Sequence, residues 1–477
     1  MLFALCVVAS AAASPAPLLV WITNSTVKLQ QLIGDQGMTN GTVTYATDTD
    51  RQTGSNLLNQ TYGLYQAGGT DLGNSFEYAG RVNFLFGDTL YLKSGDTMAW
   101  STSTHPLSGL FLNFFTNASA TALTIEPTNV NMGSFNVPAA GVSNNGNFYI
   151  VCKTGYTTNT LNTNDCSVLV RFDGTNNTFD TGRTISSLTN GGHFVDMTLY
   201  HYGTNILLFG LGDYRHSAIY LAATPAANFE TGLGALYFAG LTNGVPAWGN
   251  VETNAVPLVT DNPTNPTIGN VSVNFSSAAG LWLMTYDGGR QKQDATNSTG
   301  VYFAFASAPW GPWSAPQLIF NATRDHGFGN FIRNTNFTPS GPIGPTINPA
   351  DNDPVATPGG DYAPYMIERF TTIQSNTLTI YYTMSTWNPY TVVLMKSDFT
   401  IVPQIDVGTL VHKKNQFSFA WSAPTNGSYL VDYSSNLLAG WATFTDIVSS
   451  TSGTFDFTNI ETGGLPPARF YRLRTTP

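Results

Sequence analysis

Residues 82–106 read VNFLFGDTLYLKSGDTMAWSTSTHP, an apolar run, a polar loop and a second apolar run. Runs rich in β-branched and aromatic residues, bounded by Gly, Asn, Pro or Asp, are typical of strands joined by turns. The unit recurs four times, as NFYIVCKTGYTTNTLNTNDCSVLVRFDG (147–174), NILLFGLGDYRHSAIYLAATP (205–225), LWLMTYDGGRQKQDATNSTGVYFAFASAP (281–309) and LTIYYTMSTWNPYTVVLMKSDF (378–399). Five irregularly spaced copies predict small antiparallel sheets arranged around an axis, as in a five-bladed β-propeller.

No long segment shows helical periodicity, so the whole chain is predicted to be all-β. A large irregular β-sandwich and a β-helix are the alternatives. The variable spacing argues against strict-repeat folds such as WD40 and suits a propeller with loop insertions. We assign the propeller to residues 55–402 and expect it to be the catalytic domain.

The ends of the chain differ in character from the repeats. Residues 416–477 hold five short alternating runs and predict a small C-terminal β-sandwich of fibronectin or immunoglobulin type, joined by a linker at 403–415. This module is expected to act as a spacer, sorting or attachment unit. Residues 1–13, MLFALCVVASAAA, are apolar, too short to span a bilayer and end in small residues, which is typical of a secretory signal peptide. Residues 14–54 are expected to be an N-terminal lead-in.

Composition limits the partners of the protein. Only 10% of the 477 residues are charged and the net charge is −10, with no basic run. Nucleic acid and anionic membranes require clustered Lys and Arg, so neither is an expected partner. We expect a protein that is secreted or held at the cell surface, with a carbohydrate rather than a nucleic acid as ligand.

Two cysteines remain in the predicted mature chain. Cys152 and Cys166 flank the loop of the second copy, and a cysteine pair in an exported protein most often forms a disulfide. A metal site would need further ligands nearby, and no His or second Cys pair has the spacing. We therefore predict a disulfide, no metal site and no cofactor.

Two aspartates are the candidate catalytic residues. In GGTDLGNSFEYAGRVNFLFGDT (68–89), a two-residue turn at Ala79-Gly80 would make a hairpin in which Asp71 lies directly opposite Asp88. Directly opposed like charges destabilise a sheet, so such a pair suggests a functional demand. A bulge at one of the glycines would slip the register. Either aspartate taken alone is better explained as a turn residue, and the functional reading rests on the pair.

The propeller topology directs both aspartates towards one mouth of the central channel. Loops and strand ends of the other copies reach the same face and supply carboxylate, Arg, His and aromatic side chains, a mixture that suits a sugar. The candidate substrate-binding residues are His193, Asp196, Asp213, Tyr214, Arg215, His216, Tyr365 and Trp387. For each of them, packing within the blade or loop is the alternative role. Paired carboxylates in such a cleft are what glycoside hydrolysis requires, one as acid and one as base or nucleophile.

GGTDLGNSFEYAGRVNFLFGDT, GLGDYRHSAIYLA, DYAPYMIERF and TMSTWNPYTVVLMKS resemble, in this order, the family called domain of unknown function 4185. Some members of that family form glycoside hydrolase family 183, the endo-D-arabinofuranases. The resemblance covers roughly 55–402 and implies a five-bladed propeller, with catalytic aspartates on the TDLG and FGDT motifs, here Asp71 and Asp88. It also implies cleavage of internal linkages of D-arabinan, the furanose polymer of mycobacterial cell walls, with inversion. The C-terminal module lies outside the resemblance.

The sequence thus predicts a secreted glycoside hydrolase, endo-acting on a furanose polymer such as D-arabinan. One rival is a propeller glycosidase of another specificity, and another is a non-catalytic carbohydrate-binding propeller on a cell surface.

Overall fold

A computed structural model of the protein describes residues 17–475 apart from 34–36, 40–41, 45–57, 91–94, 134, 156–164, 289–299, 335–358, 388, 425–426, 437–439, 445 and 466–467. The predicted signal peptide at residues 1–13 lies outside the described residues. Within the part of the chain that the structure describes, no helix has the length and apolar character needed to cross a membrane.

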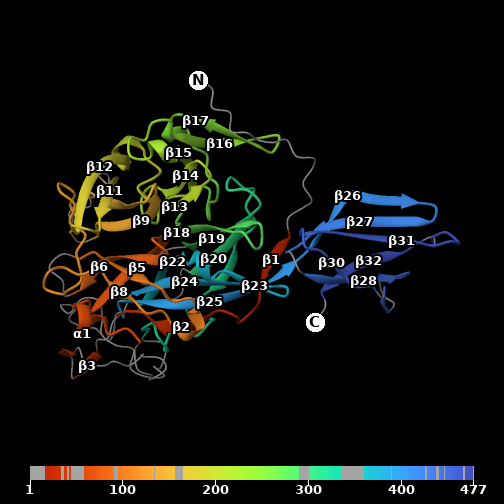
Figure 1. The fold of residues 1–477 in the computed structure, drawn as a ribbon, viewed down its shortest axis with the longest axis horizontal. Helices are drawn as coiled ribbons and strands as arrows, with labels where there is room; N and C mark the ends of the chain where they lie inside the picture. Colours follow the sequence, from red (N-terminus) through yellow and green to blue (C-terminus); the bar gives the residue numbers. More distant parts are fainter. Residues whose placement is uncertain are drawn as a thin grey trace.

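Five antiparallel sheets surround a common axis (Figure 1). The first consists of β5 (Gly69–Tyr78), β6 (Arg81–Leu90), β7 (Thr97–Ser101) and β8 (Asn113–Phe114). The second consists of β9 (Val137–Asn144), β10 (Asn147–Thr154), β11 (Cys166–Asp173) and β12 (Thr178–Ser187). The third consists of β13 (Asp196–Tyr202), β14 (Asn205–Leu211), β15 (Tyr220–Pro225), β16 (Leu236–Thr242) and β17 (Val245–Gly249).

The last two sheets complete the circle. The fourth consists of β18 (Val271–Ser276), β19 (Leu281–Gly288), β20 (Gly300–Ala306) and β21 (Gln317–Phe320). The fifth contains β22 (Gly360–Met366), β23 (Thr372–Gln374), β24 (Thr377–Trp387) and β25 (Thr391–Val402). The innermost strands β5, β9, β13, β18 and β22 contact one another in sequence, and β22 returns to β5. The predicted all-β fold and five-bladed propeller are therefore confirmed.

Strands from the segment 14–54 join the fifth blade. β1 (Leu18–Trp21) and β2 (Val27–Gln31) both pair with β25, and Leu18 lies opposite Val402. The two ends of the propeller chain are thus held in one sheet, which closes the ring. A separate hairpin is formed by β3 (Gly37–Thr39) and β4 (Thr42–Thr44).

Helices are short and lie in the connections. In the described part of the chain they are α1 (Thr61–Tyr65) and the 3₁₀ turns η1 (Pro106–Ser108), η2 (Leu188–Asn190), η3 (Ala226–Asn228), η4 (Glu252–Asn254) and η6 (Glu368–Phe370).

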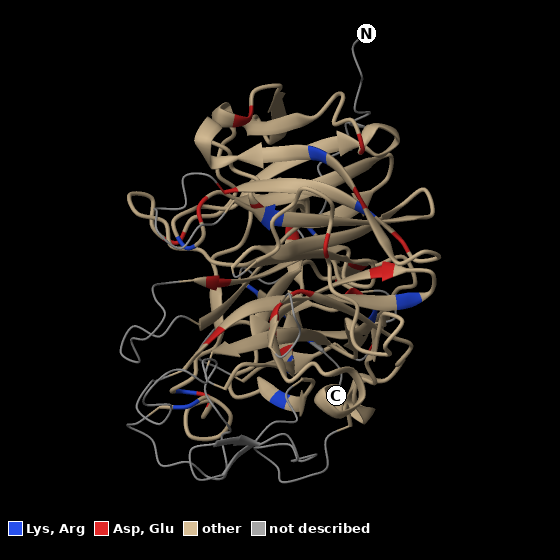
Figure 2. Cartoon of the chain, turned by 90° about the vertical axis from the view of Figure 1, so that its left-hand side faces the viewer, with Lys and Arg blue, Asp and Glu red and all other residues tan. Residues whose placement is uncertain are grey.

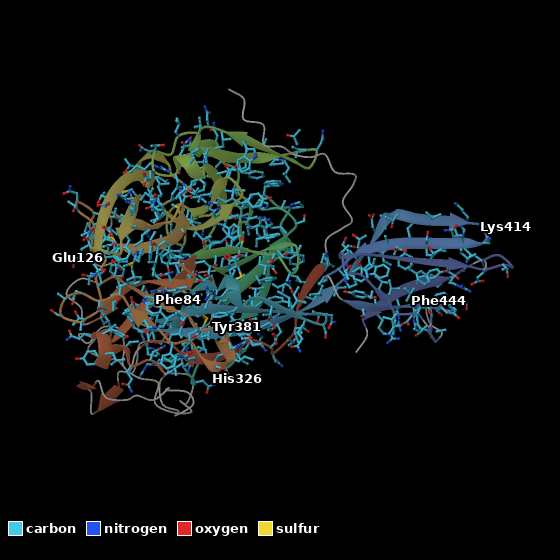
Figure 3. All side chains as sticks on the ribbon, in the orientation of Figure 1. Phe84, Glu126, His326, Tyr381, Lys414 and Phe444 are labelled. Atoms are coloured by element: carbon cyan, nitrogen blue, oxygen red, sulfur yellow. The ribbon has the colours of Figure 1, made fainter. Side chains whose placement is uncertain are left out.

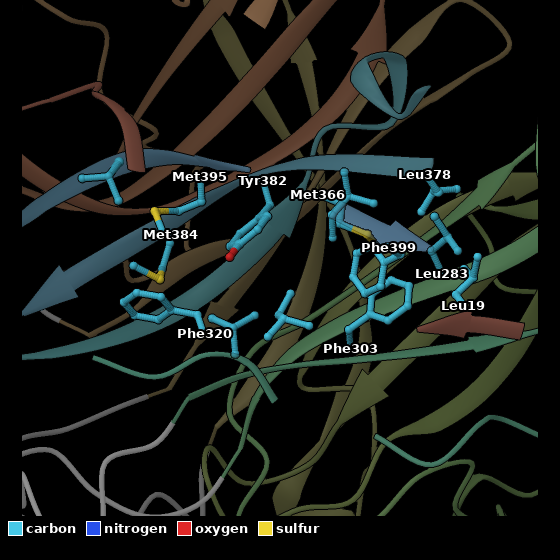
Figure 4. Close-up of a cluster of buried hydrophobic side chains, with 14 of the residues drawn as sticks. Leu19, Leu283, Phe303, Phe320, Met366, Leu378, Tyr382, Met384, Met395 and Phe399 are labelled. Carbon is cyan, nitrogen blue, oxygen red and sulfur yellow. The ribbon is translucent and has the colours of Figure 1, made fainter. Parts of the chain in front are cut away.

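The core of the propeller lies between neighbouring blades. One cluster joins the fourth and fifth blades, where Phe303 and Phe399 approach to 4.0 Å between ring centroids and Leu19 of β1 packs beside them (Figure 4). Burial of such apolar faces, at about 25 cal/mol per Å², is the main force holding the blades together. Charged residues make up only 10% of the chain, and Figure 2 shows them scattered among uncharged residues.

The C-terminal module stands beside the propeller, where Phe444 and Lys414 are labelled in Figure 3. Its two sheets contain β26 (Gln404–Lys413), β27 (Gln416–Ser422) and β31 (Thr454–Ile460), and β28 (Ser428–Ser434), β29 (Ala442–Thr443), β30 (Val448–Ser449) and β32 (Phe470–Thr475). Trp421 stacks on Phe455 in the core between them, so the predicted β-sandwich is confirmed.

Most of the predicted linker is a strand of that module. Residues 404–413 form β26 and pair with β27, and the side chain of Ile405 packs against the core of the module. The segment was predicted to be a linker, but it forms the edge strand of the sheet β26-β27-β31.

The predicted disulfide is wrong, because Cys152 and Cys166 are both free thiols. In the β10–β11 ladder Cys152 lies opposite Val168, and Cys166 lies opposite Thr154. The two cysteines are therefore diagonal neighbours, displaced by two residues, and diagonal positions in a sheet are about 7–8 Å apart. That separation exceeds the Cα distance a disulfide usually spans, at most about 6.8 Å.

Candidate active site

The hairpin of β5 and β6 forms with the predicted turn. Ala79 and Gly80 both have positive φ, 52° and 76°, as a two-residue type I′ turn requires. Pairs from Tyr78–Arg81 back to Asn74–Leu85 follow the predicted register. A bulge at Gly73, with φ of 88°, then shifts the ladder by one, and Asp71 lies opposite Gly87. The prediction that Asp71 directly faces Asp88 is therefore wrong, by one residue.

The two carboxylates nevertheless share one site. Asp71 Oδ1 lies so close over Gly87 that a Cβ there would be 2.6 Å away, and Asp88 follows directly in the chain. The negative charge of Asp88 contributes to a raised pKa of Asp71. Asp88 itself has φ of 41°, a left-handed conformation that is uncommon for a residue other than glycine.

Three threonine hydroxyls form a line beneath these aspartates. Thr70 Oγ1 is 2.9 Å from Thr89 Oγ1, which is 3.0 Å from Thr97 Oγ1. All three threonines are buried, and each is the chain neighbour of an aspartate: Asp71, Asp88 and Asp96. This buried line of hydroxyls therefore anchors the backbone directly beside all three aspartates.

Asp71 is set in an aromatic surround. Its Oδ2 accepts a 3.0 Å hydrogen bond from the Tyr362 hydroxyl, and Oδ1 is buried with no hydrogen-bonding geometry to any described residue. Burial, followed by the charge of Asp88, raises the pKa of Asp71 to about 7, although hydrogen bonds from Tyr362 and Tyr390 lower it. Asp71 can therefore carry a proton near neutral pH.

The carboxylate of Asp88 is held by one backbone N–H group. The N–H of Phe135 donates to both of its oxygens, at 3.1 and 3.2 Å. Burial raises the pKa of Asp88, and the Phe135 hydrogen bond opposes this by favouring the charged form. The Asp88 N–H donates to Oδ1 of a third aspartate, Asp96, at 3.0 Å.

Arg215 and Tyr214 extend the site across the channel. The Arg215 side chain is 14% exposed, and its Nη2 lies 3.6 Å from Oδ2 of the buried Asp287. Burial and the charges of Asp287, Asp71 and Asp196 raise the pKa of Tyr214, opposed by the Arg215 cation. Tyr214 therefore lies within electrostatic reach of Asp71, and Arg215 lies over the Tyr214 ring, 4.9 Å from its centroid.

Three other predicted residues line the same interior. Asp196 is buried, accepts a 3.1 Å hydrogen bond from Asn270 Nδ2 and has a pKa raised to about 6, chiefly by burial. Tyr365 is 1% exposed, and its hydroxyl has no partner among the described residues. Trp387 packs on an apolar cluster with Leu72 and the tyrosines beside Asp71.

His193, Asp213 and His216 lie further out. The ring of His193 stacks on Tyr220 at 4.0 Å between centroids, and its backbone N–H donates to Glu252. Asp213 and His216 are exposed at 41% and 59% of their side chains and lie 3.6 Å from each other. Their contacts are with each other and with the loop, not with Asp71 or Asp88.

A cavity of about 230 Å³ occupies the opposite end of the channel. Ser75, Glu77, Tyr200 and Glu368 are among the residues that line it. There Glu77 is paired with Arg369, and Glu368 accepts a hydrogen bond from the Tyr200 hydroxyl at 3.0 Å. We place the candidate active site at the Asp71 end, because Asp71 and Asp88 interact there and both have raised pKa values.

Asp96, Tyr362 and Tyr390 belong to the site but were not singled out from the sequence. Asp96 carries a signal that could have revealed it, because Gly-Asp-Thr occurs twice, at 87–89 and 95–97. Tyr362 reaches Asp71 through a bulge in β22, between Tyr362 and Tyr365, where Ala363 has φ of 54°. No sequence pattern used here detects such a bulge. Among the described residues, no group of three or more His, Cys, Asp or Glu has metal-binding geometry.

Gly73→Ala should destabilise the protein more than Gly80→Ala. Both positions have positive φ, which costs an alanine roughly 1 kcal/mol. At Gly73 a Cβ would also lie 3.1 Å from Thr383 Oγ1, whereas at Gly80 nothing lies within 4 Å. We expect a loss of about 1–3 kcal/mol for Gly73→Ala in urea unfolding. Equal losses in the two variants would contradict the tight packing inferred at the bulge.

Asp71→Asn should gain stability, relative to wild type, as pH rises from 5 to 8. The pKa of Asp71 is about 7 when folded against 3.8 ordinarily, so between these values the folded state binds more protons than the unfolded state. The free energy of unfolding therefore falls with rising pH, and Asn removes that contribution. Melting temperatures at several pH values test this, with Asp180→Asn at an exposed carboxylate as control. A difference between Asp71→Asn and wild type that does not change with pH would refute the raised pKa.

Comparison with known proteins gives a family and several structural likenesses. A family model for a domain of unknown function, DUF4185, matches residues 57–396. No curated protein matches at a significant level.

Similar solved structures include three named enzymes. The catalytic domain of the GH62 α-L-arabinofuranosidase of Coprinopsis cinerea is 13% identical, with 80% of this chain and 97% of that chain covered and a TM-score of 0.38. The endo-1,5-α-L-arabinanase of Thermotoga petrophila is 10% identical, with 81% of this chain and 97% of that chain covered and a TM-score of 0.38. The exo-β-1,3-galactanase of Phanerochaete chrysosporium, solved with β-1,3-galactotriose, is 9% identical, with 94% of this chain and 95% of that chain covered and a TM-score of 0.39. The family model spans well over half of the 477 residues, and the chain therefore belongs to the DUF4185 family.

Proposed function

We propose that this protein is a secreted glycoside hydrolase that cleaves internal linkages of a furanose polymer such as D-arabinan. The observation that carries the proposal is the pair Asp71 and Asp88, two interacting carboxylates with raised pKa values at one end of the propeller channel. Perturbed carboxylates of this kind concentrate at catalytic sites, because acid and base roles need different protonation states.

Asp71 acts as the general acid and Asp88 as the general base. Asp71 has a pKa near 7 and a buried Oδ1, so it holds a proton that it can give to the leaving oxygen. Asp88 receives the Phe135 N–H on both oxygens, which stabilises the charged carboxylate needed to take a proton from water. Attack of that water opposite the departing oxygen inverts the anomeric carbon.

The surroundings favour a neutral, hydroxyl-rich substrate. The interior already contains Asp71, Asp196 and Asp287; Arg215 is paired with Asp287, and the charge of Lys153 acts on Asp196. A substrate carboxylate or phosphate would be repelled, whereas sugar hydroxyls can donate to these oxygens. Trp387, which is only partly buried, provides apolar surface for a sugar face.

Asp71→Asn and Asp88→Asn should each lower the release of reducing ends by at least about 100-fold, since positioned acids and bases contribute roughly 10²–10⁴. The assay is a panel of polysaccharides, including D-arabinan and other furanosides, read for reducing ends. Asp180→Asn, at an exposed carboxylate far along the second blade, should retain full activity. Melting curves establish that each variant is folded.

Full activity in either aspartate variant would exclude the pair as acid and base. If wild type binds a panel glycan but releases no reducing ends, the protein is a carbohydrate-binding propeller. Turnover of a different glycan would retain the mechanism and change the substrate.

Substrates with an activated aryl leaving group should separate the two roles. Such a leaving group departs without protonation, so Asp71→Asn should recover much of the wild-type rate on it, whereas Asp88→Asn should not. Azide should rescue Asp88→Asn by replacing the activated water, giving a glycosyl azide of inverted configuration. Recovery in Asp88→Asn rather than Asp71→Asn would reverse the assignment.

A further inference from the structure

Asp96 lies behind Asp88, away from solvent. It precedes β7 directly, in the same Gly-Asp-Thr sequence as Asp88, and is 1% exposed. Its Oδ1 accepts the backbone N–H of Asp88 at 3.0 Å. Its Oδ2 is buried and has no hydrogen-bond partner among the described residues. This carboxyl group therefore contacts the backbone of a candidate catalytic residue and is itself shielded from solvent.

The backbone of Asp88 needs support, because its φ of 41° is sparsely populated for a non-glycine residue. Such conformations cost of order 1–3 kcal/mol and persist only when surrounding contacts hold them. Two successive N–H groups are held by one short segment: that of Asp88 by Asp96, and that of Thr89 by the carbonyl of Gly95. A Cβ on Gly95 would lie 3.1 Å from Cα of Asp88, so the segment packs directly on this residue.

The burial of Asp96 and the negative charges near it favour its protonated, uncharged form. Burial raises the pKa of Asp96 well above its ordinary value, and the nearby charges of Asp88 and Asp71 raise it further. An isolated buried carboxylate is costly, and neutralisation is the usual response. The uncharged acid still offers a carbonyl oxygen to the Asp88 N–H and adds no third negative charge to the site.

We propose that Asp96 is a positioning residue: as an uncharged acid, it holds the backbone of Asp88 in the left-handed conformation that turns the Asp88 carboxylate to the channel mouth. The consequence for turnover rests on the proposed function, whereas the hold on the Asp88 backbone does not.

Asp96→Asn and Asp96→Ala separate this role from that of a proton donor or a charge. Asn keeps a neutral carbonyl oxygen at the position of Oδ1, and Ala removes it. We expect Asp96→Asn to stay within about threefold of the wild-type kcat and Asp96→Ala to lose at least about tenfold in kcat with KM little changed, since the loss falls on the chemical step. An Asn variant as impaired as Ala, or an Ala variant with wild-type kcat, would overturn the proposal.

Amide hydrogen exchange gives a readout that needs no substrate. Exchange across residues 86–90, followed by mass spectrometry, should be faster in Asp96→Ala and close to wild type in Asp96→Asn. Asp432→Asn is the matched control, because Asp432 is equally buried at 1% but pairs with Arg472 and Arg474 in the C-terminal module. If no glycan is turned over by wild type, the proposed function fails while the exchange data still decide the role of Asp96.

If Asp96→Ala does not fold, Gly95→Ala provides a second test of the contact with Asp88. The added Cβ keeps Asp96 but presses on Cα of Asp88, so faster exchange over 86–90 and a lower kcat are expected. Wild-type behaviour in both measurements would contradict the inferred hold on Asp88.

Discussion

Closure of the ring is the constraint on which the rest of the structure depends. The innermost strands of five sheets contact their neighbours in a circle, and antiparallel pairing of β1 with β25 ties its beginning to its end. Only in the closed ring do strand ends from separate blades meet at one mouth, where Asp71 of the first blade meets Tyr362 of the fifth. Apolar packing between blades, such as Phe303 against Phe399, holds that arrangement together with the hydrogen bond from Tyr362 to Asp71.

The site gathers backbone conformations that most side chains avoid. Leu72, Asp88, Arg215 and Ala363 all have positive φ, and each lies at or beside a residue that points into the channel mouth. Hydroxyls of Thr383 and Ser385 in β24 donate to the carbonyls of Gly73 and Leu72, which fixes the bulge of β5 against the fifth blade. The surrounding strands keep these residues in their strained backbone conformations. Such strain is common where side chains must be oriented for function.

The sequence predicted mainly those features that depend on residues close together in the chain. Repeated apolar runs sufficed for the five blades, and the Ala79-Gly80 turn sufficed for the register from Asn74 to Tyr78, because both depend on neighbours along one hairpin. The register at Asp71 could not be predicted, since the bulge at Gly73 is stabilised by Thr383, three hundred residues away. The hydrogen bond from Tyr362 to Asp71 is equally distant in the chain and could not be predicted. Asp96, by contrast, lies eight residues from Asp88 and carries the repeated Gly-Asp-Thr signal, which was overlooked. The cysteines were paired because proximity in a hairpin was mistaken for direct opposition.

The pairing of Leu18 with Val402 also governs how the molecule is made. During synthesis the first strand of this pair emerges long before its partner. Pairing of such distant segments is slow, because the chain loses the entropy of loop closure before any stabilising contact forms. Until Val402 is available, the edge of β1 and the apolar face that Leu19 presents to the fourth and fifth blades have no cover. Exposed edges of this kind invite association with other chains. Biogenesis therefore requires the nascent amino-terminal segment to be kept from wrong partners until the whole propeller has been synthesised.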